Sequence, residues 1–228
     1  MSTFNIADVP CGGDSPLLLI AGPCQVEGLD HALMCAEALA GMAGDAGMGF
    51  VYKSSFDKAN RTSLSGKRGL GLSASMDVFN EIRETTGLPL LTDIHTEEQC
   101  AIVAEAADIL QIPAFLCRQT DLLQACAETG RAVNVKKGQF MSPAEMKHVL
   151  DKLEACKASG SMLTERGTFF GYHRLVNDFV GLGDMMVVTP SSTEVSRGQG
   201  TLVTDKEVRQ VATFLKSVAG PNFERSLM

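Results

Sequence analysis

The sequence has no tryptophan, only two tyrosines and no apolar run long enough to cross a membrane. Its first residues also lack the basic segment and the apolar segment that make up a secretory signal. We therefore expect a cytoplasmic protein without a membrane partner. A formal net charge of -7 argues against nucleic acid as a partner, because binding to a phosphate backbone depends on excess positive charge. Any anionic ligand must be drawn by a local cationic cluster.

The seven cysteines show no paired spacing, and their odd number does not suit a framework of disulfides. Several of them fall within apolar helical patterns. This usage indicates packed thiols in a reducing compartment.

Nucleotide-binding signals are also missing. The chain has no phosphate-binding loop of the glycine-lysine type, and the glycines at 66–71 do not directly follow a predicted strand. An anion site must therefore be built from side chains that converge from several strands.

Apolar runs bounded by turn residues alternate along the chain with helical patterns. Leu17–Ala21 is a continuous apolar run between Pro16 and Gly22, which is typical of a strand buried on both faces. Capping boxes at Thr96–Gln99 and Ser142–Glu145 mark two helix starts. The strands predicted in this way lie at 17–21, 50–52, 89–95, 108–113, 132–136, 161–164 and 185–188.

This alternation without a linker predicts one α/β domain over residues 1–228, as either an open doubly wound sheet or a closed barrel. Polar residues follow nearly every strand, which favours a TIM (β/α)8-type barrel, because a barrel gathers its strand C-ends at one mouth. About seven strands are recognisable, so we expect an incomplete barrel. Residues 1–15 are expected to form a plug or hairpin, and residues 191–228 a divergent segment with one helix.

A cationic segment follows the second predicted strand, 50–52. Lysine and arginine supply charge-assisted donors that suit phosphate or carboxylate groups. A solvated basic loop is the alternative interpretation. The polar side chains of this segment are Lys53, Ser55, Lys58, Asn60, Arg61, Thr62 and Ser63.

Further cations are expected to meet this segment at the barrel mouth, since side chains two apart on a strand point the same way. Together they are too many for one monoanion, which predicts a site for two anionic groups or two phosphorylated substrates. The cations of this set are Lys53, Lys58, Arg61, Arg118, Lys136 and Arg166.

Three more residues at strand ends are candidates for chemistry. Cys24 follows a buried strand and is a packed thiol, a metal ligand or a nucleophile. Asp93 and His95 are metal ligands or an acid–base pair, or His95 is a partly buried structural side chain. The residues alone leave these alternatives open.

Six short motifs stand in order between residues 16 and 190. They are Ala21-Gly-Pro-Cys24, Lys53-Ser-Ser-Phe-Asp-Lys-Ala-Asn-Arg-Thr-Ser63, Thr92-Asp-Ile-His95, Gln111-Ile-Pro-Ala-Phe-Leu-Cys-Arg-Gln119, Asn134-Val-Lys-Lys-Gly-Gln-Phe140 and Arg166-Gly-Thr-Phe-Phe-Gly-Tyr172. Together they resemble the 3-deoxy-D-manno-octulosonate 8-phosphate synthase family. The related seven-carbon synthase shares the Gly-Pro-Cys start, but the Lys-Ala-Asn-Arg-Thr-Ser run is similar to the eight-carbon enzyme.

The resemblance implies a transferase that condenses phosphoenolpyruvate with D-arabinose 5-phosphate for lipopolysaccharide synthesis and releases phosphate. C3 of the enol attacks the sugar aldehyde while water adds at C2, and cations stabilise the developing charge. A homotetramer is implied, in which the Arg61 region reaches a neighbouring subunit's site. The resemblance places Lys58, Gln111, Lys136 and Arg166 on phosphoenolpyruvate and Lys53, Asn60, Arg61 and Thr62 on the sugar phosphate, with Asp93 near its hydroxyls; Ser55, Arg118 and Gln139 are expected to bind substrate as well.

The resemblance also implies a divalent metal such as Mn, Fe or Zn, because Cys24 matches the metal-dependent branch of the family. The family then continues with Asp-x-Thr-His, Ser-Gly-Gly-x-Arg and Glu-x-His-Pro motifs, whereas this chain reads Val188-Thr-Pro-Ser-Ser192 and offers no counterpart for those ligands. We therefore expect poor or no metal-dependent activity. The alternatives are an impaired remnant that binds phosphorylated sugars or phosphoenolpyruvate or assembles with intact subunits, and the seven-carbon (DAHP) synthase, which would prefer erythrose 4-phosphate.

Overall fold

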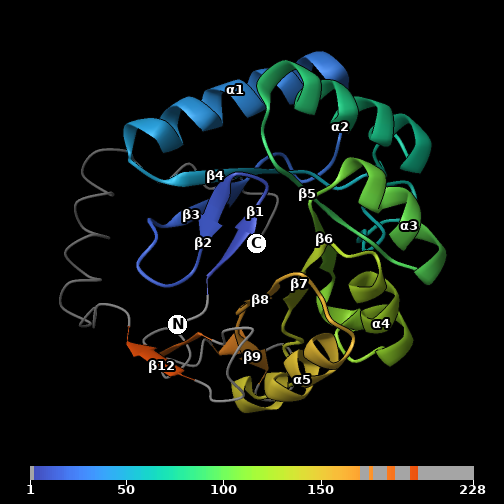
Figure 1. The fold of residues 1–228 in the computed structure, drawn as a ribbon. Helices are drawn as coiled ribbons and strands as arrows, with labels where there is room; N and C mark the ends of the chain where they lie inside the picture. Colours follow the sequence, from blue (N-terminus) through green and yellow to red (C-terminus); the bar gives the residue numbers. More distant parts are fainter. Residues whose placement is uncertain (1–2, 170–174, 177–183, 188–195, 200–228) are drawn as a thin grey trace, which may run out of the picture.

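The computed structural model describes residues 3–169, 175–176, 184–187 and 196–199. Its main element is a six-stranded sheet in the order β3-β4-β5-β6-β7-β8, which curls while the helices cover its outer side as an arc (Figure 1). The strands are β3 (Leu18–Ala21), β4 (Gly49–Lys53), β5 (Leu90–Asp93), β6 (Ile109–Ile112), β7 (Ala132–Lys136) and β8 (Ser161–Thr164). The helices are α1 (Leu29–Asp45), α2 (Leu72–Thr86), α3 (Glu97–Ala106), α4 (Thr120–Glu128) and α5 (Lys147–Ala155), with 3-10 turns η1 (Ala114–Leu116) and η2 (Pro143–Met146).

Each strand of this sheet pairs in parallel with the next strand along the chain. Parallel neighbours need a crossover between them, and the helices supply it. The arrangement is that of an incomplete TIM-type barrel, which confirms the predicted fold class. Among the described residues, no helix has the length and apolar character needed to cross a membrane.

The seventh predicted strand is not part of the six-stranded parallel sheet. Residues Asp184–Val187 do form a strand, β11, but it pairs antiparallel with β12 (Ser196–Gln199) and not with the parallel sheet. Its partner lies close in sequence, so this pairing closes only a short loop at small entropic cost. A similar short antiparallel pair joins β9 (Thr168–Phe169) and β10 (Leu175–Val176). The predicted helix beyond residue 200 lies outside the described residues.

Both predicted capping boxes are present. The Gln99 side chain accepts a hydrogen bond from the backbone N–H of Thr96 at 3.2 Å, which fixes the start of α3. Glu145 accepts one from the N–H of Ser142 at 2.8 Å, with Pro143 next in the chain. The second box opens on the 3-10 turn η2, and α5 follows it directly.

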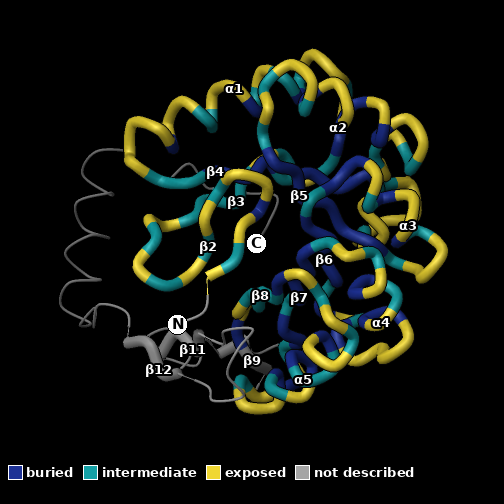
Figure 2. The backbone as a smooth tube through the Cα atoms, viewed as in Figure 1, coloured by how far each residue is buried: buried dark blue, intermediate teal, exposed yellow. Residues whose placement is uncertain are grey.

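Strand alternation divides the core into two parts, one on each side of the sheet. The larger part lies between the strands and the helices, where the buried residues gather in Figure 2. The smaller part fills the inside of the curled sheet. Its members are Ile6, Val51, Leu91, Ile109 and Ala132, with Leu18, Ile20 and Met162 packed against them.

An N-terminal hairpin closes the end of the barrel where the strands begin. It consists of β1 (Phe4–Ile6) and β2 (Val9–Cys11), paired antiparallel. A Cβ at Gly49 would lie 2.7 Å from Val9, and one at Gly160 would lie 2.4 Å from the ring of Phe4. The hairpin therefore packs against the starts of β4 and β8, and the opposite end of the sheet carries the polar groups.

Candidate active site

A layer of polar side chains stands above the inner apolar cluster. It follows from strand alternation, because residues two positions beyond Val51, Leu91 and Ile109 point into the same interior. The layer therefore comprises Lys53, Asp93, Gln111, Asn134, Lys136 and Thr164, drawn from β4 to β8. It places polar chemistry at the carboxyl ends of the strands, where barrels carry their active sites.

Asp93 is the centre of this layer. It is only 8% exposed, and its carboxylate accepts hydrogen bonds from the Ser55 hydroxyl and the Gln111 amide. The Lys136 ammonium lies 3.5 Å from the same carboxylate. A buried carboxylate that keeps a cation and two neutral donors is fully compensated, so it can stay ionised.

Two more amide and hydroxyl groups extend this network across the sheet. The Asn134 amide donates to the Gln111 carbonyl oxygen at 2.9 Å, and the Thr164 hydroxyl donates to the Asn134 carbonyl oxygen at 3.1 Å. Gln111 and Asn134 are both buried. Because every bond fixes the orientation of the next amide, the network holds the Gln111 donor on Asp93.

The pKa shifts reflect a cluster of like and unlike charges. Burial alone would raise the pKa of Asp93, but Lys53, Lys136 and the hydrogen bonds outweigh it and hold the pKa below its usual range. Burial lowers the pKa of Lys136, Asp93 opposes that shift, and the charges of Lys53 and Arg166 add to it. The charges of Lys53 and Arg166 thus both act on Lys136.

The second part of the site is the loop between β4 and α2. Arg68 fastens it internally, because its guanidinium Nε donates to Asp57 at 2.9 Å and its carbonyl oxygen accepts from the Lys58 N–H at 2.7 Å. The N–H of Gly71 donates to Phe56 at 3.1 Å. The hydrogen bonds and charge of Arg68 hold the pKa of Asp57 below its usual range. Hydrogen bonds therefore join the start of the loop to its end.

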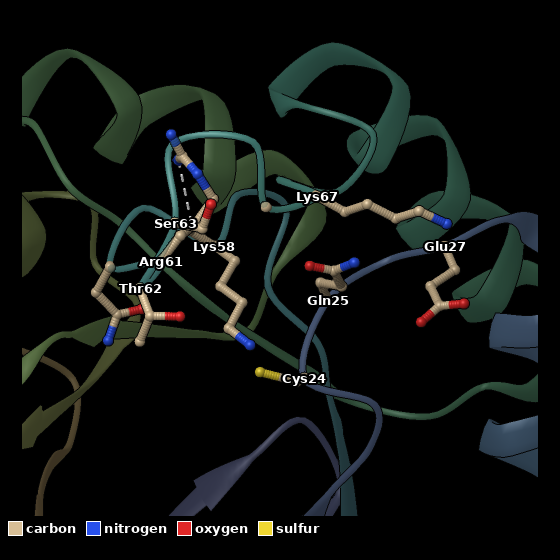
Figure 3. A pocket seen from close by; sticks show the side chains of 10 residues that line it. Cys24, Gln25, Glu27, Lys58, Arg61, Thr62, Ser63 and Lys67 are labelled. Carbon is tan, nitrogen blue, oxygen red and sulfur yellow. Dashed lines mark hydrogen bonds between the residues drawn. The ribbon is translucent and has the colours of Figure 1, made fainter. Parts of the chain in front are cut away.

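This loop and the strand end at Cys24 enclose a pocket of about 380 Å³. Figure 3 shows the Lys58 ammonium reaching toward the Cys24 thiol, with Gln25 beside it. Cations and hydroxyls dominate the wall, which suits a phosphorylated ligand. The lining residues are Cys24, Gln25, Glu27, Lys58, Asn60, Arg61, Thr62, Ser63, Gly66 and Lys67.

A close backbone contact places Cys24 at this pocket. A Cβ on Gly22 would lie 2.0 Å from the Lys53 carbonyl oxygen, so only glycine allows the strand end to pass there. The Ser54 hydroxyl then donates to the Pro23 carbonyl oxygen at 3.0 Å, and Gln25 forms a parallel bridge with Ser55. The Gly-Pro-Cys motif is thereby fixed against the end of β4.

The structure brings most predicted site residues into these two neighbouring places. Lys53, Asp93, Gln111 and Lys136 belong to the polar layer. Ser55 donates a hydrogen bond to Asp93 of this layer, and the charge of Arg166 acts on Lys136. Lys58, Asn60, Arg61, Thr62 and Cys24 line the pocket.

Two predicted residues take part in none of the contacts described above for the polar layer or the pocket. Arg118 is exposed after η1, and Gln139 is half-buried after β7. The proposed pairing of Asp93 with His95 also has a different outcome. The His95 ring packs edge-on against Phe56 at a centroid distance of 5.4 Å, while the hydrogen bonds of Asp93 go to Ser55 and Gln111. This geometry agrees with the structural alternative for His95.

The sequence indicated the direction of the Asn134 side chain but no role for it, and it missed two other contributors. Asn134 and Thr164 complete the polar network, and Lys137 lies buried beneath the loop that follows β7. Strand alternation was the available signal for the first two, because both share an inward face with Lys136 or Met162. For Lys137 no local pattern distinguishes a buried ammonium from a solvated one.

The described part of the chain supplies few ligands for the expected divalent metal. Cys24 is exposed there, and no three or more His, Cys, Asp or Glu side chains gather into a cluster suited to a metal ion among these residues. A divalent ion ordinarily needs about three to four protein ligands in a fixed geometry. The described residues alone therefore do not complete a metal centre.

Comparisons with known proteins were made for the whole chain. Residues 2–192 match the DAHP synthetase I family. A 2-dehydro-3-deoxyphosphooctonate aldolase of Rickettsia bellii (strain OSU 85-389) is 57% identical over 182 residues, which are 80% of this chain and 66% of the relative. The aldolase of Methylobacterium radiotolerans is 57% identical over 191 residues, or 84% and 67%. That of Brucella ovis is 52% identical over 206 residues, or 87% and 74%.

The chain thus spans slightly less than two thirds of the length of the Rickettsia relative. The matched part contains the six-stranded sheet, the polar layer and the cationic pocket. Similarity of this extent joins the strand-end motifs and the observed fold to one enzyme family.

Proposed function

The chain belongs to the DAHP synthetase I family, and from that premise we propose that it acts on phosphoenolpyruvate, D-arabinose 5-phosphate and water to form the eight-carbon 2-dehydro-3-deoxyphosphooctonate and phosphate. The observation that supports this function is the presence of two adjoining anion-binding places, the polar layer and the loop pocket. Two phosphorylated substrates need two such places. The name of the relatives, 2-dehydro-3-deoxyphosphooctonate aldolase, supports the same choice.

In this proposal, phosphoenolpyruvate binds between Lys58, Gln111, Lys136 and Arg166. Lys136 and Arg166 are close enough for their charges to interact, so a bound dianion would relieve repulsion between them. Gln111 is already oriented by Asn134 and Asp93. The pyruvyl carboxylate and phosphate would replace water as the partners of these cations.

Arabinose 5-phosphate would bind toward the loop. Asn60, Arg61 and Thr62 line the pocket and suit the phosphate, while Lys53, Ser55 and the Asp93 carboxylate suit the aldehyde end and the hydroxyls. A half-buried Lys53 that faces Asp93 can donate to the aldehyde oxygen as it becomes an alkoxide. The chain's own residues thus orient both reactants and stabilise the negative charge that develops.

The synthase of lipopolysaccharide precursors is proposed to be cytoplasmic and a homotetramer. Light scattering on the purified chain tests the assembly: a mass four times that of the chain supports it, and a monomer contradicts it. Cys24 is proposed as the ligand of a divalent metal, because it lines the pocket and follows the β3 end. Binding of Cd²⁺ that produces a thiolate charge-transfer band, and that is lost in Cys24→Ser, would support this role.

The experiment that tests the function measures phosphate release with both substrates, with and without added Mn²⁺ or Cd²⁺. We expect release that requires both substrates and is far slower than that of a full-length relative assayed alongside. Preference for erythrose 4-phosphate would show the seven-carbon reaction instead. Turnover equal to the relative's would contradict the expected impairment, and failure of calorimetry to detect either substrate would contradict the function itself.

An impaired, ligand-binding chain is the second candidate. It is favoured by the contrast between two well-formed anion-binding places and the lack of clustered metal ligands among the described residues. Binding of both substrates at ordinary affinity without any phosphate release would select this candidate. Release from both substrates excludes it.

A further inference from the structure

Lys137 is a buried lysine that no part of the proposed reaction uses. It is 1% exposed and directly follows Lys136, whose side chain points into the barrel mouth. Because neighbouring strand residues point to opposite faces, the Lys137 ammonium goes the other way, beneath the loop after β7. Its backbone N–H donates to the Thr164 carbonyl oxygen at 2.9 Å and so extends the pairing of β7 with β8.

The Lys137 ammonium binds oxygen atoms from two different loops. It donates to the carbonyl oxygens of Met141 at 3.1 Å and Gly138 at 3.4 Å in the loop after β7. It also donates to the Gly167 carbonyl oxygen at 2.7 Å and lies 3.4 Å from a Glu165 carboxylate oxygen in the loop after β8. One buried charge therefore ties the two loops together.

The second loop carries Arg166 between the two residues that Lys137 holds. The same Glu165 oxygen accepts the backbone N–H of Arg166 at 2.9 Å and that of Gly167 at 2.7 Å. Gly167 has a φ of 85°, which suits glycine and turns the chain sharply after Arg166. The backbone on both sides of Arg166 is thus fixed by Lys137 or by its partner Glu165.

From this arrangement we infer that Lys137 is a positioning residue, which holds the exposed Arg166 guanidinium opposite Lys136 so that the two form one site for phosphoenolpyruvate. The ligand in this inference rests on the proposed function, whereas the clamp on the Arg166 backbone does not. Lys137 touches no substrate. Its effect passes through Glu165 and Gly167 to Arg166, and a site displaced by about 1 Å can lose about a hundredfold in efficiency.

The test compares Lys137→Met with Lys147→Met in the full chain. Methionine keeps the length and apolar stem of lysine but cannot bind the four oxygens. Lys147 is the matched control, because its ammonium pairs with Asp151 along the same helix, at 2.7 Å. Folding of each variant is checked by circular dichroism and thermal unfolding.

Calorimetry supplies the first readout. In Lys137→Met we expect the affinity for phosphoenolpyruvate to fall about tenfold or more, as for the loss of a hydrogen bond to a charged group, while the affinity for arabinose 5-phosphate stays within about twofold. Lys147→Met should change neither. An unchanged affinity for phosphoenolpyruvate, or an equal loss for both ligands, overturns the inference.

Nitrogen-15 NMR of the arginine Nε–H groups supplies the second readout, which needs no ligand. The signal that disappears in Arg166→Lys belongs to Arg166, and we expect it to move or broaden in Lys137→Met and to stay in place in Lys147→Met. An unmoved signal overturns the clamp. If the unaltered chain binds no phosphoenolpyruvate, the proposed function fails and this signal alone decides the positioning role.

Glu165→Gln covers the case in which Lys137→Met does not fold. Glutamine keeps the acceptor for the Arg166 and Gly167 N–H groups but removes the charge that faces the Lys137 ammonium. We expect a smaller loss of phosphoenolpyruvate affinity, about threefold, with a shift of the same NMR signal. If both the affinity and the NMR signal stay unchanged, the inference is contradicted.

Discussion

The polar layer and the loop pocket differ in how their side chains are held in place. In the layer, Asp93, Gln111 and Asn134 are buried and joined by side-chain hydrogen bonds that run across neighbouring strands. In the loop, the internal ties are the Asp57–Arg68 pair, exposed hydrogen bonds of the Arg61 and Ser63 side chains and a few backbone bonds, and the Arg68 side chain is 61% exposed. The layer is therefore rigid before a ligand arrives, whereas the loop can adapt to one.

The largest expected effect in this comparison comes from Asp93→Ala. The change leaves Lys53 and Lys136 without their shared anion and the Ser55 and Gln111 donors without their acceptor. We expect the free energy of unfolding to fall by about 3 kcal/mol, which urea denaturation measures. Asp151→Ala, which breaks the exposed pair with Lys147, is the control and should change it by less than about 0.5 kcal/mol. Equal losses would show that the layer is no more rigid than the surface.

Gly22→Ala is expected to have the next largest effect. Its Cβ would lie 2.0 Å from the Lys53 carbonyl oxygen, so the strand end and the Cys24 turn must move. We expect destabilisation of about 2 kcal/mol in the same urea experiment. Gly44→Ala is the matched control in α1, where an added Cβ meets nothing within 4 Å, and it should be neutral or stabilising by up to about 1 kcal/mol. A harmless Gly22→Ala would contradict the close approach.

The pH dependence of stability should also test the polar layer, because Asp93 is its buried carboxylate. The pKa of Asp93 is lowered in the folded chain, so its contribution is present above the pKa of about 3.9 that an unfolded aspartate has. That contribution is lost as pH falls through the folded value. The difference in unfolding free energy between the unaltered chain and Asp93→Ala should therefore shrink from pH 7 toward acid. A difference that grows in acid would show that Asp93 is protonated in the folded chain.

Arg68→Ala should have the smallest effect on stability. An exposed ion pair contributes about 0.2 to 1 kcal/mol, so unfolding should change by less than about 1 kcal/mol. The loop would lose its tie to Asp57, and the affinity for arabinose 5-phosphate should fall about threefold. The affinity for phosphoenolpyruvate should fall less, because Lys58 is its one proposed partner in the loop. Calorimetry measures both. Equal weakening of both ligands would show that the loop and the layer are one site.

Apolar runs bounded by turn residues, together with period-two alternation, carried most of what could be predicted from sequence. The runs identified the strands that became β3 to β8, and alternation predicted that Lys53 and Lys136 would converge. These local signals cannot tell which strand a segment pairs with, so the strand predicted at 185–188 was counted with the parallel sheet, whereas β11 pairs with β12. Pairing depends on contacts between distant parts of the chain, and alternation contains no information about them.

The candidate site was predictable in part for the same reason. Side chains that project from strand ends were found, whereas the roles of His95 and Lys137 depend on which loop covers them. A two-residue spacing suggested that Asp93 and His95 face each other, but β5 ends at Asp93 and the alternation does not continue beyond it. Local patterns therefore describe the strands of this site better than its loops.

The most direct test of the central claim is whether two anionic ligands bind at once. Arabinitol 5-phosphate lacks the aldehyde and cannot react, so calorimetry can titrate phosphoenolpyruvate into the chain saturated with it. The account predicts that phosphoenolpyruvate still binds, one molecule per chain, with an affinity within about threefold of that without the sugar phosphate. Loss of phosphoenolpyruvate binding by direct competition would contradict it, because the polar layer and the loop pocket would then be a single anion site.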